Sequence, residues 1–306
     1  MNTITVSAPG KLLLLGDHAV VYGKPCLVTA VSERLTVSLS PSHDNAMHFD
    51  TPGVSDTRFV AAAIEAAQGS WGNRLPPVLV ATKSGFSGNY GLGSSAAVTV
   101  ATLYAIAEYI GRKVTPGELF RLSRNAILAV QKVGSGFDAA SAIWGGTVWY
   151  EHLGRTITPA ASDHMPLIVG FTGVKADTAA IVADVAKKYA AQTERVTRIF
   201  DAIADLVMGA REKMAEGDWE RVGKLMDFNQ EYLRDLGVSS EKLESLIVAA
   251  KGAGAWGAKL SGAGGGDCMI AVAPKEKRGQ IEKAIEAAGG QVIHITPNAP
   301  GVRREP

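Results

Sequence analysis

The chain has 306 residues, of which 46% are hydrophobic and 20% are charged, a composition that suits one large or two modest compact domains. Its 31 lysines and arginines against 30 aspartates and glutamates leave a net charge of +1. A charge so close to zero argues against a general attraction to nucleic acid or to a membrane surface.

The cysteines and the N-terminus indicate a cytoplasmic protein. Cys26 and Cys268 are far apart and have no CxxC spacing, so a disulfide framework is not expected. The apolar run at residues 12–15 contains four leucines, which is far shorter than a signal-peptide core or a membrane span of roughly 20 residues.

The first half of the chain is predicted to combine short strands with helices. Short or alternating apolar runs between turn-prone segments predict strands at residues 3–7, 11–15, 35–39, 77–82 and 146–150. Helices are predicted at residues 59–67, 96–110, 116–131 and 139–143, and residues 41–56 are predicted to form a surface loop. Thr115 precedes Pro116 and is the expected N-cap of the third helix.

The second half is predicted to be richer in long amphipathic helices. Helices are expected at 176–215 with a break around Gly209, at 217–236 with Asp218 near the start, at 239–253 and at 275–288. Strands are expected at 166–171, 268–273 and 291–295, with a glycine-rich loop at 261–267. Because strands and helices are mixed without strict alternation, the sequence predicts an α+β protein of two domains, residues 1–160 and 161–306.

Two glycine-rich segments raise the question of nucleotide binding: GLGSSAA at 91–97 and SGAGGGDC at 261–268. Neither has the GxxxxGK[ST] pattern of a Walker P-loop. GAGAWG at 252–257 spells GxGxxG but follows a predicted helix. GLGSSA has a strand before it and a helix after it, yet the acidic residue that a dinucleotide fold requires about 20 residues later has no good candidate. A dinucleotide-binding fold is therefore disfavoured.

The first glycine-rich segment fits a phosphate cradle. Gly91 and Gly93 would let backbone N–H groups approach an anion, and the helix starting near Ser95 would direct its positive end at the same point. The hydroxyls of Ser94 and Ser95 could cap this helix, bind a phosphate oxygen or ligate Mg²⁺. An ordinary capped turn is the alternative that this segment alone leaves open.

Four segments in order resemble the GHMP kinases, the superfamily named for galactokinase, homoserine kinase, mevalonate kinase and phosphomevalonate kinase. They are SAPGKLLLLGDHAVVYGKP (7–25), GLGSSAAVTVA (91–101), GSGFDAASAIWGG (134–146) and KLSGAGGGDCMIA (259–271). The resemblance covers essentially the whole chain. It implies an N-terminal domain like that of ribosomal protein S5, a ferredoxin-like C-terminal domain, and ATP bound between them.

The resemblance also implies a set of ATP-binding and catalytic residues. The ATP-binding residues would be Gly91, Leu92, Gly93, Ser94, Ser95, Ala96, Gly262, Ala263, Gly264 and Gly265. Lys11 would neutralise charge near the transferred phosphoryl group, and Asp138 would act as general base or orienting group for the acceptor hydroxyl. The alternatives are that Lys11 is a solvated lysine at a strand end and that Asp138 only caps a helix.

The resemblance also implies that Asp17, His18 and Thr178 contact the acceptor. The alternatives are that Asp17 and His18 are only a pair of loop residues and that Thr178 only caps a helix.

One feature of the sequence departs from the family. Mevalonate kinases usually carry a Mg²⁺-binding glutamate about three helical turns before the catalytic aspartate, whereas Ile127 occupies that place and residues 121–137 contain no carboxylate. Mg²⁺ would then be held by Ser95, phosphate oxygens and water.

Two acceptors are compatible with these motifs. HAVVYGKP and the ending NAPGVR resemble mevalonate kinases, whereas QKVGSGFDAASA and GAGGGDC are closer to phosphomevalonate kinases. A second phosphate would require extra cations, for which Lys83, Lys132 and Lys175 are candidates. We predict phosphorylation of the 5-hydroxyl of mevalonate by a monomer or homodimer. Phosphomevalonate kinase is the main alternative, and a non-kinase binder or an ATP-dependent decarboxylase is less favoured.

Overall fold

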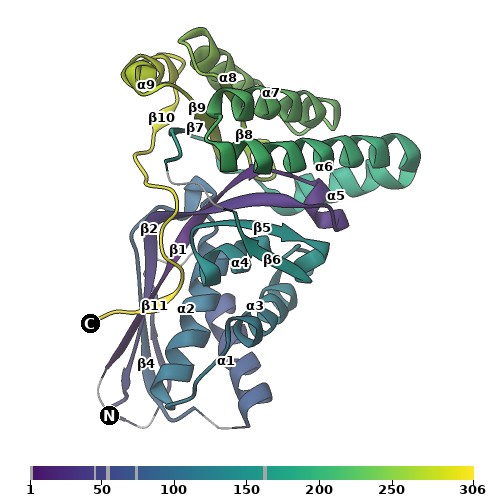
Figure 1. Ribbon diagram of the computed structural model, residues 1–306. Helices are drawn as coiled ribbons and strands as arrows, with labels where there is room; N and C mark the ends of the chain where they lie inside the picture. The colour runs from purple at the N-terminus through teal and green to yellow at the C-terminus, as the bar shows by residue number, and fades with distance from the viewer. Residues whose placement is uncertain (1–2, 45, 53–55, 73–74, 161–163) are drawn as a thin grey trace.

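The computed structural model describes residues 3–44, 46–52, 56–72, 75–160 and 164–306. The chain forms two lobes, each with a sheet and its own helices (Figure 1). The two glycine-rich segments of the sequence lie where the two lobes meet. Among the described helices, none combines the length and apolar character that crossing a membrane requires.

The N-terminal lobe is built on a seven-stranded sheet in the order β11-β1-β2-β4-β3, with β5 pairing β2 and β6. Its strands are β1 (Ile4–Leu15), β2 (Cys26–Pro41), β3 (His48–Asp50), β4 (Val78–Ser84), β5 (Thr147–Glu151), β6 (Thr156–Pro159) and β11 (Arg303–Arg304). The two strands predicted at 3–7 and 11–15 are one strand, because Pro9 and Gly10 mark a shift in register and not a turn. β3 lies inside the segment that was predicted to be a loop.

Four helices cover one face of this sheet (Figure 1). They are α1 (Arg58–Trp71), α2 (Ser94–Tyr109), α3 (Pro116–Gln131) and α4 (Phe137–Trp144), with short 3-10 turns at Ala19–Tyr22 (η1), Gly88–Tyr90 (η2) and His152–Gly154 (η3). α2 is the central helix, and its small side chains let it pack against β1, β2, α1 and α3. The predicted N-cap of α3 is confirmed: the Thr115 hydroxyl accepts the Glu118 N–H at 3.2 Å.

The C-terminal lobe has the predicted ferredoxin-like arrangement. Its four strands lie in the antiparallel order β10-β7-β9-β8. They are β7 (Leu167–Phe171), β8 (Gly257–Ser261), β9 (Cys268–Val272) and β10 (Gln291–Val292). The helices are α5 (Thr178–Ala191), α6 (Thr193–Glu216), α7 (Trp219–Asp235), α8 (Glu241–Gly252) and α9 (Arg278–Ala287), and a 3-10 turn (η4) spans Lys275–Lys277.

The break expected near Gly209 is wrong. The chain turns at Gln192, which separates α5 from α6, and α6 continues through Gly209 without interruption. One glycine inside a well-packed helix costs only about 1 kcal/mol relative to alanine, so packing overrides it here. Asp218 does start α7, since its carboxylate accepts the Arg221 N–H at 3.1 Å.

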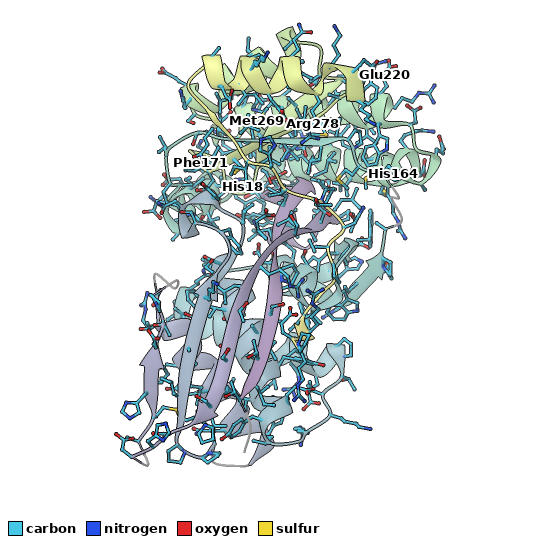
Figure 2. The ribbon with its side chains drawn as sticks, turned by 90° about the vertical axis from the view of Figure 1, so that its left-hand side faces the viewer. His18, His164, Phe171, Glu220, Met269 and Arg278 are labelled. Carbon is cyan, nitrogen blue, oxygen red and sulfur yellow. The ribbon has the colours of Figure 1, made fainter. Side chains whose placement is uncertain are left out.

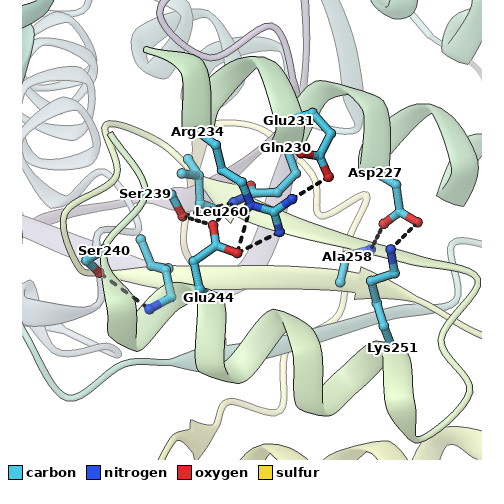
Figure 3. A network of polar contacts seen from close by, with 11 residues as sticks. Asp227, Gln230, Glu231, Arg234, Ser239, Ser240, Glu244, Lys251, Ala258 and Leu260 are labelled. Atoms are coloured by element: carbon cyan, nitrogen blue, oxygen red, sulfur yellow. Dashed lines mark hydrogen bonds and ion pairs between the residues drawn. The ribbon is translucent and has the colours of Figure 1, made fainter. Parts of the chain in front are cut away.

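β8 is an edge strand that α7 covers (Figure 3). The Ala258 N–H donates to the Asp227 carboxylate and the Leu260 N–H donates to the Gln230 side chain, each at 3.0 Å. Gly257 permits this close approach, because a Cβ there would lie 1.9 Å from the Gly223 carbonyl oxygen. α7 thus satisfies edge groups that would otherwise be open to pairing with another chain, and it fixes the strand that leads into the second glycine-rich loop.

After β10 the chain returns to the N-terminal lobe (Figure 1). β11 pairs with β1, and the Arg34 guanidinium donates to the carbonyls of Pro300 and Gly301 at 2.6 and 2.8 Å. The predicted domain division after residue 160 lies at residues 161–163, which are outside the described residues. The predicted second domain, 161–306, therefore includes a tail that packs on the first lobe.

Candidate active site

A cavity of about 490 Å³ lies where the lobes meet, and side chains from both lobes line it. The N-terminal lobe contributes Lys11 from β1, His18 and Asp138, and the C-terminal lobe contributes Thr178 and Gly262. His18 is at the junction of the lobes in Figure 2. The structure therefore brings together residues that are as far apart in the sequence as Lys11 and Gly262.

Lys11 and Asp138 form an ion pair in this cavity. The Lys11 ammonium is 3.2 Å from the Asp138 carboxylate, is 3.2 Å from the Gly91 carbonyl oxygen and lies 5.4 Å from the centre of the Phe137 ring. Asp138 is in the first turn of α4, where the helix dipole stabilises a negative charge, but Gly136 is the N-cap and no side chain caps the helix. Asp138 therefore does not cap the helix, and its ion pair is with Lys11.

The first glycine-rich segment ends in an uncapped helix N-terminus. Gly93 is the N-cap of α2 with φ of 79°, and no side chain accepts from the first-turn N–H groups, so these donors remain available to an anion. A Cβ at Gly93 would lie 3.1 Å from the Lys11 side chain, and one at Gly91 would lie 2.4 Å from the Asp267 carboxylate. The two glycines thus leave room for charged groups next to the helix end.

Most of the predicted residues of this segment line the cavity, namely Gly91, Gly93, Ser94, Ser95 and Ala96. Leu92 does not. Its side chain is only 1% exposed and belongs to the core, while its carbonyl accepts the Lys11 N–H at 2.8 Å. Leu92 therefore ties the loop to β1, and its contact with ATP remains a prediction that its side chain does not support.

The second glycine-rich loop contributes less than expected. Gly262 and Ala263 line the cavity, whereas Gly264 and Gly265 do not. Both of these glycines have positive φ, and a Cβ at Gly264 would lie 2.1 Å from the Val238 carbonyl oxygen. Gly264 and Gly265 shape the loop, and their contact with ATP remains a prediction that the lining of the cavity does not support.

The expected substrate contact of Asp17 is also not supported, because its side chain is fully buried and is not among the residues that line the cavity. Its carboxylate is 2.6 Å from the Lys259 ammonium, which is itself 0% exposed, and it accepts the Gly262 N–H at 2.8 Å. This pair joins the N-terminal lobe to β8. Asp17 therefore positions the second glycine-rich loop and does not face the cavity.

His18 does line the cavity. Burial lowers its pKa below the ordinary value of 6.5, so the imidazole is neutral at neutral pH. Nε2 is 2.9 Å from the Ala263 carbonyl oxygen, and because a carbonyl can only accept, Nε2 carries the proton. Nδ1 is then the acceptor nitrogen of this ring. His18 also has φ of 62°, an uncommon conformation that is often found at functional sites.

Thr178 begins α5 at the rim of the cavity. The Asp177 carboxylate accepts the Ala180 N–H at 3.0 Å, so Asp177 is the N-cap of this helix. The alternative that Thr178 is only a cap is therefore not supported.

Three charged residues that line the cavity, Lys175, Asp267 and Arg124, were not among the predicted catalytic or binding residues, although Lys175 was a candidate cation. There Lys175 is 3.2 Å from the carboxylate of Asp267. The sequence could have pointed to Asp267, because it ends the glycine-rich motif SGAGGGD. No feature of the sequence pointed to Arg124 on α3 as a residue of the cavity. The other candidate cations, Lys83 and Lys132, are exposed and do not line the cavity.

Family profiles match both lobes: the profile "GHMP kinases N terminal domain" matches residues 58–146, and "GHMP kinases C terminal" matches residues 210–291. The chain therefore belongs to the GHMP kinase family, whose members use ATP as phosphoryl donor.

Individual relatives are similar over almost their full length. A mevalonate kinase of Thermococcus sibiricus is 35% identical, covering 99% of this chain and 98% of the relative. A phosphomevalonate kinase of a Streptomyces species is 29% identical, covering 98% and 99%. The solved structure of L. major mevalonate kinase in complex with R-mevalonate has a TM-score of 0.82 and 27% identity, covering 96% of this chain and 95% of that one.

Proposed function

We infer that the protein is an ATP-dependent kinase that phosphorylates the 5-hydroxyl of mevalonate, a step of isoprenoid precursor biosynthesis. The observation that carries this inference is the full-length similarity to mevalonate kinases. The Lys11–Asp138 pair beside an uncapped helix N-terminus supplies the chemistry that such a kinase requires. We propose that it works in the cytoplasm as a monomer or a homodimer.

We assign the chemical roles as follows. The N–H groups at the start of α2 hold the ATP phosphates, and Lys11 stabilises the negative charge of the group in transfer. Asp138 accepts the proton of the acceptor hydroxyl as its oxygen attacks the γ-phosphorus. Nδ1 of His18 and the Thr178 hydroxyl orient the acceptor. Because phosphoryl transfer passes through a loose transition state, positioning and charge provide most of the catalysis.

Mg²⁺ is the metal that such a kinase requires, and the residues fit a site that is completed by ATP. Ser95 lines the cavity at the start of α2, and Ile127 lines it where the family usually has a glutamate. Across the described ranges, no three His, Cys, Asp or Glu side chains gather into a metal cluster. Mg²⁺ accepts oxygen ligands and keeps several waters, so the Ser95 hydroxyl would complete a shell of phosphate oxygens and water. Bound there, the ion would neutralise phosphate charge.

The Ser95→Ala variant is expected to raise the Mg²⁺ concentration needed for half-maximal activity several-fold at fixed ATP, with little change in the KM for mevalonate. The wild-type protein without nucleotide is expected to bind Mg²⁺ very poorly. Mg²⁺ titrations of activity and calorimetry of the nucleotide-free protein measure the two effects. Tight metal binding without nucleotide, or an unchanged Mg²⁺ requirement, would mean that the metal has another protein ligand.

Phosphomevalonate is the second candidate acceptor, favoured by the 29% identical Streptomyces relative. Its extra phosphate would need more cations than mevalonate does. Of the three lysines considered, only Lys175 lines the cavity, and Asp267 already pairs with it. These three lysines therefore give no support to a site for a second phosphate.

The acceptor assay tests this function directly. Purified protein with MgATP is expected to phosphorylate mevalonate, with a kcat/KM at least tenfold above that for phosphomevalonate, and to release no CO₂ from diphosphomevalonate. ADP formation with each acceptor, and product identity by mass spectrometry, provide the measurement. A preference for phosphomevalonate would replace the proposed function by the second candidate.

A further inference from the structure

The cationic side chains of the cavity are almost all neutralised by neighbours. In the part of the chain that the structure describes, three of the four lysines and arginines lining the cavity pair with a carboxylate that also lines it: Lys11 with Asp138, Lys175 with Asp267, and Arg58 with Asp56. Arg124 is the fourth, and no described carboxylate forms an ion pair with it. Arg124 is thus the lining cation whose charge is left for a ligand.

The backbone next to Asp138 makes room for Arg124. Gly136 has φ of 97°, and a Cβ at this position would lie 3.1 Å from Cδ of Arg124. The arginine stem therefore packs directly against the segment that leads into α4. Its Nε is buried and has no hydrogen-bond partner among the described residues. A buried donor without a partner is costly and points to an acceptor supplied by a ligand.

Ser135 provides a second unmatched group at the same place. It precedes Gly136, lines the cavity and is only 4% exposed, and its buried Oγ has no hydrogen-bond partner within the described ranges. The Tyr150 hydroxyl donates to the Ser135 carbonyl, which holds this part of the loop in place. An arginine donor and a serine hydroxyl thus lie on neighbouring segments of one wall.

Arg124 lies on α3 well away from the start of α2, where the phosphates of ATP are proposed to bind. Nε2 of Gln131 is 3.5 Å from Oγ of Ser95, so the C-terminal end of α3 lies beside the start of α2. Arg124 is seven residues earlier, about 10 Å along the helix axis at 1.5 Å per residue. This distance favours a group of the acceptor over the phosphates of ATP.

We propose that Arg124, assisted by the Ser135 hydroxyl, binds the carboxylate of the acceptor. The proposal rests on the proposed function, since mevalonate carries a carboxylate at the opposite end from the hydroxyl that is phosphorylated. A guanidinium presents a planar pair of donors that matches a carboxylate in a bidentate arrangement. Binding the acid end at Arg124 would leave the hydroxyl end to reach Asp138.

Steady-state kinetics of Arg124→Gln test the proposal, with Arg121→Gln as the matched control. Arg121 is an exposed arginine on the same helix that does not line the cavity. Arg124→Gln is expected to raise the KM for mevalonate at least tenfold and to change the KM for ATP less than twofold. Arg124→Lys should recover part of the loss, Ser135→Ala should show a smaller rise, and the control should match wild type. Thermal midpoints and nucleotide affinity verify that each variant is folded.

An uncharged acceptor shows whether Arg124 recognises the negative charge of mevalonate or only maintains the shape of the cavity. Wild type should strongly prefer mevalonate over its uncharged amide, and Arg124→Gln should lose most of this preference. A raised KM for ATP with an unchanged KM for mevalonate would place Arg124 on the phosphates and overturn the proposal. An unchanged preference for mevalonate over the amide would also overturn it.

The wild-type protein separates this proposal from the proposed function. If wild type phosphorylates another anionic acceptor and not mevalonate, the proposed function fails, and Arg124 is judged on that acceptor and its neutral analogue. If the acceptor that wild type uses has no anionic group, both fail.

Discussion

Replacing Asp138 by asparagine is expected to lower kcat by about 10³-fold, which is within the usual contribution of general base catalysis. The amide has nearly the shape of the carboxylate but cannot take the proton of the acceptor hydroxyl. ATP affinity should be retained or slightly increased, because Lys11, now 3.2 Å from a neutral side chain, adds an unbalanced positive charge near the phosphates. Turnover with saturating mevalonate and calorimetric ATP binding give the two quantities.

Asp184→Asn is the control for this variant, since Asp184 is an exposed carboxylate on α5 that pairs with Lys187 outside the cavity. It should behave as wild type. A near-wild-type kcat for Asp138→Asn would remove Asp138 from the mechanism. A tenfold or greater loss of ATP affinity would mean that Asp138 acts on nucleotide binding and not on proton transfer.

Replacing Lys259 by methionine is expected to lower the free energy of unfolding by about 3–5 kcal/mol, because it leaves the Asp17 carboxylate charged, fully buried and without its counterion. The Gly262 N–H is then left to partner this carboxylate, so the loop that presents Gly262 and Ala263 to the cavity should loosen as well. Urea denaturation measures the stability, and the KM for ATP reports on the loop.

The double variant Asp17→Asn with Lys259→Met is the matched comparison. It removes both buried charges, and replacing a buried ion pair completely is often nearly neutral, so most of the lost stability should return. If the double variant is no more stable than Lys259→Met alone, an uncompensated charge is not the cause of the loss.

Local signals predicted much of the fold. Thr115 followed by Pro116 marked the start of α3 correctly, since capping depends on a few adjacent residues. β8 was missed because its five residues, GAKLS, include only two apolar side chains, Ala258 and Leu260, which is too weak a local pattern to mark a strand. Its pairing with β9 and its cover by α7 are long-range. β11 was missed for a related reason. It consists of two exposed arginines, and only the approach of the tail to β1 makes it a strand.

At the candidate active site too, residues in local motifs could be predicted from the sequence, whereas residues placed by long-range contacts could not. The glycines before α2 were expected at a helix N-terminus from their local sequence, and Gly93 is the N-cap of α2. Asp17 was misassigned because it is next to His18 in the sequence. At His18 the backbone adopts a positive φ, and the two side chains have different surroundings: His18 lines the cavity and Asp17 meets Lys259. Arg124 carried no signal, since only the return of the chain at Gly136 places Asp138 near α3.

The returning tail has a consequence for the order of assembly during translation. Arg34 is made early, but the carbonyls of Pro300 and Gly301 that its guanidinium binds follow the entire ferredoxin-like lobe in the sequence. At synthesis rates of about 5–20 residues per second, the ribosome needs roughly 7 to 27 seconds to make that lobe. Throughout this interval the first lobe lacks β11, and the edge of β1 is open. The first lobe can therefore complete its sheet with β11 only after the chain of the second lobe has been made.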